Sequence, residues 1–220
     1  DALKKQVNIS NEILSRIVQE AKRFNLKVAA HTMWPEGLET AINAGVSSLE
    51  HCPPYVGGIL PDEVFIKVKE KGVFFVPTAD LLRRNYMIFH DAGALLAEKE
   101  YYQNMPAKSL RKMLKMVEKV KKALIKRKEV REAFAELFNN YKEHYAANFK
   151  KALQYGIKIA ACTDSGANYT PHGIVPKELE FYVKLGMTPE QAILSATKVS
   201  AELLGLEKEL GTLEPGKKAD

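Results

Sequence analysis

The chain repeats one local pattern: an amphipathic helix that ends at Gly or Asn, a short apolar run, and a polar side chain where that run ends. In the first copy, Ser10 can cap a helix, Asn25 suits its left-handed end, and the apolar run leads to His31. Helices that alternate with short β-prone runs are typical of βα units. The pattern therefore predicts an α/β fold with a parallel sheet.

Four strands are expected, each after a helix or helical segment that ends at Asn or Gly. They should lie near residues 27–31, 47–51, 73–77 and 157–163. A complete (β/α)8 barrel has eight strands and typically about 250 residues, whereas this chain has 220 residues. We therefore expect a half-barrel, or a piece of a barrel whose other half lies elsewhere.

The same pattern divides the chain into three segments. Residues 1–79 should form βα units, residues 80–150 a helical insertion, and residues 151–220 the last strand and the closing helices. The insertion follows the third expected strand, and loops at such positions in barrel enzymes often cover the substrate. Two interpretations stay open for it, a packing subdomain on the barrel rim and a mobile lid.

The charge and composition exclude some classes of protein. The net charge is +6, and residues 107–132 hold eleven Lys or Arg against three Glu. Without interleaved aromatic residues this segment indicates a solvated helix face rather than a nucleic-acid site. No apolar run approaches the roughly 18–20 residues that cross a bilayer, and the two cysteines lack the spacing of a disulfide framework. We expect a cytoplasmic protein with neither a nucleic-acid nor a membrane partner.

Polar side chains that can bind metal follow three of the expected strands. These are His31, His51 and Asp164. In parallel α/β folds the ligand site lies at the carboxyl ends of the strands. Two imidazoles and a carboxylate are also a typical catalytic zinc set with one position open for water. Spacing alone leaves a metal site and ordinary hydrogen-bonded side chains as equal alternatives.

Several segments resemble successive motifs of the amidohydrolase superfamily, in its imidazolonepropionase-like and Xaa-Pro dipeptidase-like branch. The segments are Val28–Thr32, Ser48–Cys52, Cys162–Gly166, Pro171–Gly173, and the closing signature in Met187–Gly205 and Gly211–Asp220. Apart from the helical insertion, the resemblance covers nearly the whole chain.

The resemblance implies a TIM-like barrel of a metal-dependent hydrolase, with this chain as its C-terminal half, strands five to eight. His31 and His51 would be metal ligands on the fifth and sixth strands, and Asp164 would be the ligand and catalytic proton shuttle on the eighth. The cofactor would be a divalent metal, zinc before manganese, iron or cobalt, with two metals in the intact enzyme. The implied reaction is hydrolysis of an amide or peptide C–N bond by metal-activated water.

The chain also departs from the family pattern. It has no His-x-His pair, which the family carries on its first strand, and no candidate for the fourth-strand lysine. Lys27 and Lys158 lie at the starts of their expected strands, at the wrong end of a barrel. We therefore interpret the chain as a truncated piece of a longer enzyme that is inactive alone. We expect it to self-associate or to pair with the missing N-terminal half. The expected substrate of the enzyme is a small molecule or a dipeptide.

Two alternatives remain for the function. One-metal deaminases of the superfamily carry a glutamate three residues after the fifth-strand histidine, where this chain has Trp34, and Glu36 lies beyond Pro35. This favours an amide hydrolase over a deaminase. The other alternative is a non-catalytic half-barrel that binds metal or a partner.

Further candidates lie near the expected metal ligands. His172 and Tyr169, in the loop after Asp164, could contact the substrate, although a role in bracing the loop is equally open for His172. Cys52 and Cys162 could bind zinc but fit better as small buried hydrophobes.

Overall fold

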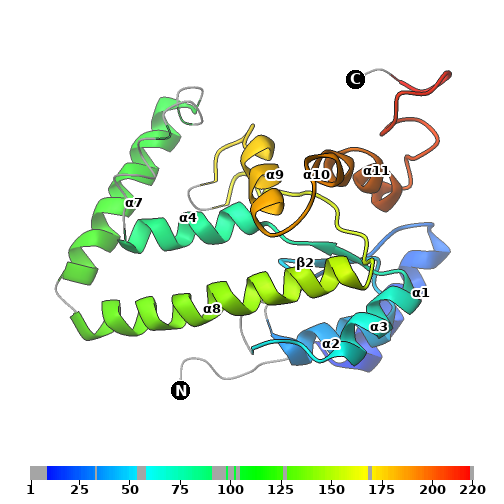
Figure 1. Cartoon of the computed structure of the whole chain (residues 1–220), viewed down its shortest axis with the longest axis horizontal. Helices are drawn as coiled ribbons and strands as arrows, with labels where there is room; N and C mark the ends of the chain where they lie inside the picture. The colour runs from blue at the N-terminus through cyan, green and yellow to red at the C-terminus, as the bar shows by residue number, and fades with distance from the viewer. Residues whose placement is uncertain are drawn as a thin grey trace.

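The computed structural model describes residues 9–32, 34–53, 58–90, 98, 102, 105–125, 128–167 and 170–218. Helices and strands alternate in the first third (Figure 1): α1 Asn11–Arg23, β1 Ala29–His31, α2 Pro35–Ala44, β2 Ser48–Glu50, α3 Asp62–Lys71 and β3 Phe74–Val76. Helices follow: α4 Ala79–His90, α7 Ala107–Ile125, α8 Lys128–Gln154, α9 Val175–Lys184, α10 Pro189–Ala196 and α11 Lys198–Leu204. The expected α/β chain is confirmed at this level.

The strands form a parallel sheet in the order β1-β2-β3. Ala30 is opposite Leu49, and Leu49 is opposite Phe75. The register also places His31 opposite Glu50, and Glu50 opposite Val76. The carboxyl ends of the strands therefore lie level along one edge of the sheet.

The segment expected as a fourth strand, residues 157–163, pairs with the sheet through a single bridge between Ile159 and Phe75. Phe75 N–H donates to Lys158 O and Ala160 N–H donates to Phe75 O, each at 2.9 Å. The next amide, that of Ala161, donates instead to Ser195 O at the end of α10. The Ala161 amide faces away from β3, and the next ladder donor on β3 would be residue 77, a proline without an N–H. The pairing therefore stops at one bridge, so the prediction of a full strand was wrong, while the predicted position beside β3 was right.

The helix ends follow the local sequence signals. Ser10 Oγ accepts from Ile13 N–H at the start of α1, and Asn25 is left-handed with a φ of 55°. α2 begins at Pro35 and ends at Gly45, whose φ is 79°. Thr188 and Gln191 form the reciprocal capping box at the start of α10. Helix starts and stops are therefore encoded locally, as the sequence pattern predicted.

One apolar core holds the sheet and the surrounding helices together. Leu49 and Phe75 from the strands pack with Phe65, Phe149 and Tyr182 from α3, α8 and α9, and each of these is fully buried. Phe74 and Val76, the alternate residues of β3, form a smaller cluster with Val199 and Leu203 of α11. β3 is therefore buried on both faces, as is usual for a parallel strand.

The long helices extend the molecule away from the sheet. Figure 1 shows α8 running across the molecule and α7 at the end farthest from α1, α2 and α3. α7 packs against both α4 and α8. Among the helices in the described ranges, none combines the length and the apolar character needed to cross a bilayer.

Candidate functional site

Two histidines meet at the carboxyl edge of the sheet. His31 is the last residue of β1, and His51 directly follows β2. Their rings have centroids 4.5 Å apart and an interplanar angle of 69°. Because β1 and β2 are adjacent and in register, the parallel pairing itself brings the two imidazoles together.

Three non-glycine residues at this edge have left-handed backbones. The φ angles are 58° at His51, 50° at Thr78 and 52° at Asp164. This conformation costs about 1–3 kcal/mol for a non-glycine residue and persists only where the surroundings enforce it. Strained residues of this kind cluster at functional sites, and here two of the three are predicted metal ligands.

Thr78 forms a short, buried hydrogen bond with His51. Thr78 Oγ1 donates its one proton to Pro77 O at 2.7 Å and lies 2.7 Å from His51 Nδ1. A hydroxyl that donates its one proton to Pro77 O can only accept from His51, and this arrangement places the N–H on Nδ1. The Nε2 lone pair of His51 is then available for a metal or a proton.

The charges around His51 include a carboxylate that the sequence analysis did not single out, Glu50. Partial burial lowers the pKa of His51, and the neighbouring His31 lowers it further, while Asp164 opposes both. Burial also raises the pKa of Glu50, with the charge of Asp164 adding to the rise. Glu50 Oε1 accepts from Ser48 Oγ at 2.6 Å. His31 and Asp164 therefore shift the pKa of both Glu50 and His51, so the four ionisable groups lie close enough together to interact electrostatically.

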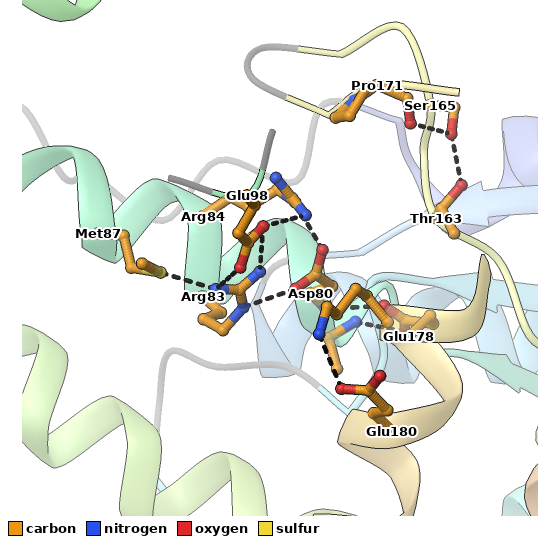
Figure 2. A network of polar contacts seen from close by, with 12 residues as sticks. Asp80, Arg83, Arg84, Met87, Glu98, Thr163, Ser165, Pro171, Glu178 and Glu180 are labelled. Atoms are coloured by element: carbon orange, nitrogen blue, oxygen red, sulfur yellow. Dashed lines mark hydrogen bonds and ion pairs between the residues drawn. The ribbon is translucent and has the colours of Figure 1, made fainter. Parts of the chain in front are cut away.

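Asp164 begins a tightly hydrogen-bonded loop. Ala167 N–H donates to Asp164 O, and Thr163 Oγ1 and Ser165 Oγ lie 2.7 Å apart. Ser165 Oγ also donates to Pro171 O at 3.1 Å, which closes the loop (Figure 2). His172 lies over this loop, because a Cβ on Gly166 would be 3.9 Å from His172 Nε2. The loop thus places His172 beside Gly166, two residues after Asp164.

A buried carboxylate from a distant helix holds the start of α4. Glu178 of α9 is fully buried and accepts from Ala79 N–H at 2.6 Å and from Asp80 N–H at 2.7 Å. These amides directly follow Thr78 and belong to the unpaired donors at a helix N-terminus. Burial raises the pKa of Glu178 to about 8, although both backbone N–H groups oppose the rise.

An ionic network continues from this turn along α4. Asp80 accepts from Arg83 Nε at 2.6 Å and from Arg84 Nε at 2.5 Å, and Glu98 pairs with both arginines. Tyr102 Oη accepts from Arg84 Nη1 at 2.7 Å. Figure 2 shows this network with Glu178 beside Asp80. Neither Glu178 nor the network was predicted, because their partners lie far apart in sequence.

The donor types at the edge suit a divalent metal, but a complete ligand group is not assembled. The rings of His31 and His51 are in contact, and the charge of Asp164 raises the pKa of both His51 and Glu50. Imidazole and carboxylate are ordinary zinc ligands. In the described part of the chain, however, no three His, Cys, Asp or Glu side chains are arranged to hold an ion. The metal roles of His31, His51 and Asp164 stay predictions.

The remaining candidates lie apart from this pair or outside the described residues. Tyr169 falls outside the described residues. Cys52 is fully buried, as expected for a small apolar side chain, whereas Cys162 is an exposed free thiol, so the expectation of a buried side chain was wrong for Cys162. Lys27 Nζ donates to Glu202 O of α11, and Lys158 Nζ pairs with the Glu202 carboxylate. Both lysines are therefore bound to α11, consistent with their predicted place at the starts of the strands.

Glu178 should make stability fall as pH rises from about 4.5 to 8, with little further change above that range. Its folded pKa of about 8 lies above the ordinary 4.5, so the folded chain keeps a proton that the unfolded chain has released. Raising pH across this window therefore lowers the free energy of unfolding, by up to a few kcal/mol. Urea unfolding across the window should show this slope in the wild type and a flatter one in Glu178→Gln.

The exposed Glu180, on the same helix, provides the control for this slope. Glu180→Gln should keep the wild-type pH dependence, because Glu180 pairs with Lys177 at the surface. An equal slope in Glu178→Gln and the wild type would contradict the assignment to Glu178.

Comparison with known proteins places these features in a family. The sequence pattern of the Amidohydrolase family matches residues 2–220. The ochratoxinase of Aspergillus niger is 30% identical over 213 residues, which are 96% of this chain and 35% of that protein. The imidazolonepropionase of Fusobacterium nucleatum subsp. nucleatum is 35% identical over 86 residues, 37% of this chain and 20% of that protein.

The fold is also similar to that of solved members. A crystal structure of a Xaa-Pro dipeptidase with bound methionine in its active site superposes with a TM-score of 0.64 at 30% identity, covering 96% of this chain and 42% of that one. The chain thus spans well under half the length of these relatives and matches a part of their barrels. Because the family pattern matches almost its whole length, this chain belongs to the amidohydrolase family, as its sequence motifs indicated.

Proposed function

We propose that the protein to which this chain belongs is a metal-dependent hydrolase of amide or peptide C–N bonds, and that the chain forms strands five to eight of its barrel. The observation that carries the proposal is the pair formed by His31 and His51, whose ring centroids lie 4.5 Å apart at adjacent strand ends. Parallel α/β enzymes place their chemistry at this edge. Family membership supports the same assignment.

Each polar group at the edge has a role in the proposed reaction. His31 and His51 would hold a divalent metal, with zinc as the first expectation and a second metal in the whole enzyme. The metal, when bound, supplies activation of water and polarisation of the carbonyl group. Thr78 keeps the Nε2 lone pair of His51 free. Asp164 is the third ligand and takes the proton that the leaving nitrogen later receives.

The substrate class follows from the relatives rather than from the edge itself. One relative is named a Xaa-Pro dipeptidase, and dipeptides or acylated amino acids are the substrates we propose. His172 lies over the loop after Asp164 and is a proposed substrate contact. Tyr169 is proposed on its sequence position alone. A deaminase is less well supported, because Trp34 stands at the position of the deaminase glutamate.

A second candidate is a half-barrel that binds a partner without turnover. It is favoured by the lack of three converging metal ligands among the described side chains. The printed sequence also contains no His-x-His pair. Both observations concern the chain of 220 residues, and the hydrolase proposal concerns the longer enzyme.

The isolated chain should hydrolyse dipeptides and acylated amino acids little or not at all, because it lacks the His-x-His ligands. The assay combines the purified chain with zinc, manganese or cobalt and a panel of both substrate classes. Metal-dependent turnover that Asp164→Asn abolishes would contradict this expectation and show that the partial ligand set suffices.

The chain should bind zinc weakly, and through His31 and His51. His31→Ala and His51→Ala should each weaken binding by at least about tenfold, since each removes one of few ligands. Titration calorimetry measures this, with His144→Ala on α8 as the control. Wild-type affinity in both site variants would contradict the proposed metal site, and Cys52 and Cys162 would then be the next ligands to test.

An apolar surface supports the proposed self-association or pairing with an N-terminal half. α1 buries Val18 but leaves Ile13 55% and Ile17 43% exposed one turn apart, and the flanking residues Ile9, Phe24 and Leu26 are 42%, 67% and 64% exposed. β1 pairs with β2, and no strand in the described ranges pairs with its other edge. Open edges and apolar stripes of this kind are normally covered.

The chain should therefore self-associate at high concentration. Replacing Ile13 and Ile17 together by Glu should weaken association by about tenfold or more, because apolar burial is lost and charge is added. Sedimentation velocity over a concentration series measures this. Ile193→Glu on α10, at a residue that is 58% exposed, is the control. A wild-type monomer throughout the series would contradict the proposal.

A further inference from the structure

The start of α4 links a distant helix to the imidazole of His51. Thr78 contacts His51 through its hydroxyl, and the next two amides, of Ala79 and Asp80, donate to Glu178. Thr78 and Glu178 are 1% and 0% exposed. His51 and Glu178 come from different elements, and the turn at Thr78 is the physical connection between them.

The turn needs an external support. Thr78 has a left-handed backbone, with a φ of 50°, and such a residue returns to an ordinary conformation unless its neighbours are fixed. Glu178 contacts the amides on the C-terminal side with both carboxylate oxygens, at 2.6 and 2.7 Å. On the N-terminal side, the hydroxyl of Thr78 donates to Pro77 O.

The conformation of Thr78 has a chemical consequence for His51. A Thr78 hydroxyl that donates to Pro77 O accepts from His51, which requires the proton of His51 to be on Nδ1. If the turn relaxes, the hydroxyl no longer faces Nδ1, and the proton can move to Nε2. The nitrogen that faces the site would then lose its free lone pair.

We propose that Glu178 is a positioning residue, which fixes the Thr78 turn from α9 and so keeps the proton of His51 on Nδ1. The value of this tautomer for metal binding rests on the proposed function, but the tautomer itself does not. Asp80 supports the same turn through its side chain, which is held by Arg84. Glu178 acts on the backbone and Asp80 on the side chain, so their effects are separable.

The test measures the ring ¹⁵N chemical shifts of His51 by NMR in the metal-free chain at about pH 9, where an imidazole is neutral and Glu178, whose pKa is about 8, is mostly ionised. The wild type should show Nδ1 protonated. Thr78→Val should move the proton toward Nε2, and Thr78→Ser should restore the wild-type pattern. Glu178→Gln should shift the tautomer in the same direction as Thr78→Val, whereas Glu180→Gln should not. A wild-type tautomer in folded Glu178→Gln or in Thr78→Val would overturn the proposal.

Two further measurements cover the other outcomes. If Glu178→Gln does not fold, hydrogen exchange of the Ala79 and Asp80 amides in the wild type decides, because rapid exchange would show that the carboxylate does not hold them. Zinc titration then separates the two proposals. Thr78→Val should weaken zinc binding about tenfold. A changed tautomer with unchanged zinc affinity would support the positioning role and contradict the metal role of His51.

Discussion

Parallel pairing of β1, β2 and β3 is the constraint on which the candidate site depends. Parallel strands end at a common edge, and the register places His31 opposite Glu50, directly before His51. Side chains that are 20 residues apart in sequence thereby come within ring contact. The core beneath, centred on Leu49 and Phe75, holds that register because a shift by one residue would exchange the two faces of a strand. The arrangement of charges at the edge is thus a consequence of apolar packing below it.

The left-handed residues at the edge explain why neighbouring side chains can act together. Successive residues of a strand point to opposite faces, so Glu50 and His51 would be separated if the strand simply continued. His51 instead has a φ of 58°, and Glu50 and His51 respond to the same two groups, His31 and Asp164. The strain at His51, Thr78 and Asp164 therefore has a chemical result, because it gathers ionisable groups that an extended chain would divide.

The sequence predicted the parts of this arrangement that are local, and missed those that depend on distant contacts. Helix stops at Asn25 and Gly45 and the strand-end positions of His31 and His51 follow from propensity and periodicity. Thr78 lies 27 residues from His51, and Glu178 lies 99 residues from Ala79. No local pattern marks such partners. The strand expected at 157–163 became one bridge because Pro77 of the neighbouring segment has no N–H to continue the ladder beyond Phe75, and which residue faces the segment is set by the tertiary pairing.

The network along α4 shows how the insertion is joined to the same turn. Arg84 is fully buried and bound by Asp80, Glu98 and Tyr102. A buried ion pair adds little net stability compared with apolar packing, yet removing one partner leaves a charge without compensation. Such a network therefore favours one arrangement of α4 over others, while adding little to the overall stability of the fold. Asp80 belongs to both systems, because its side chain binds the arginines and its amide donates to Glu178. The insertion and α9 therefore favour the same position of α4. That position also places Thr78 beside His51.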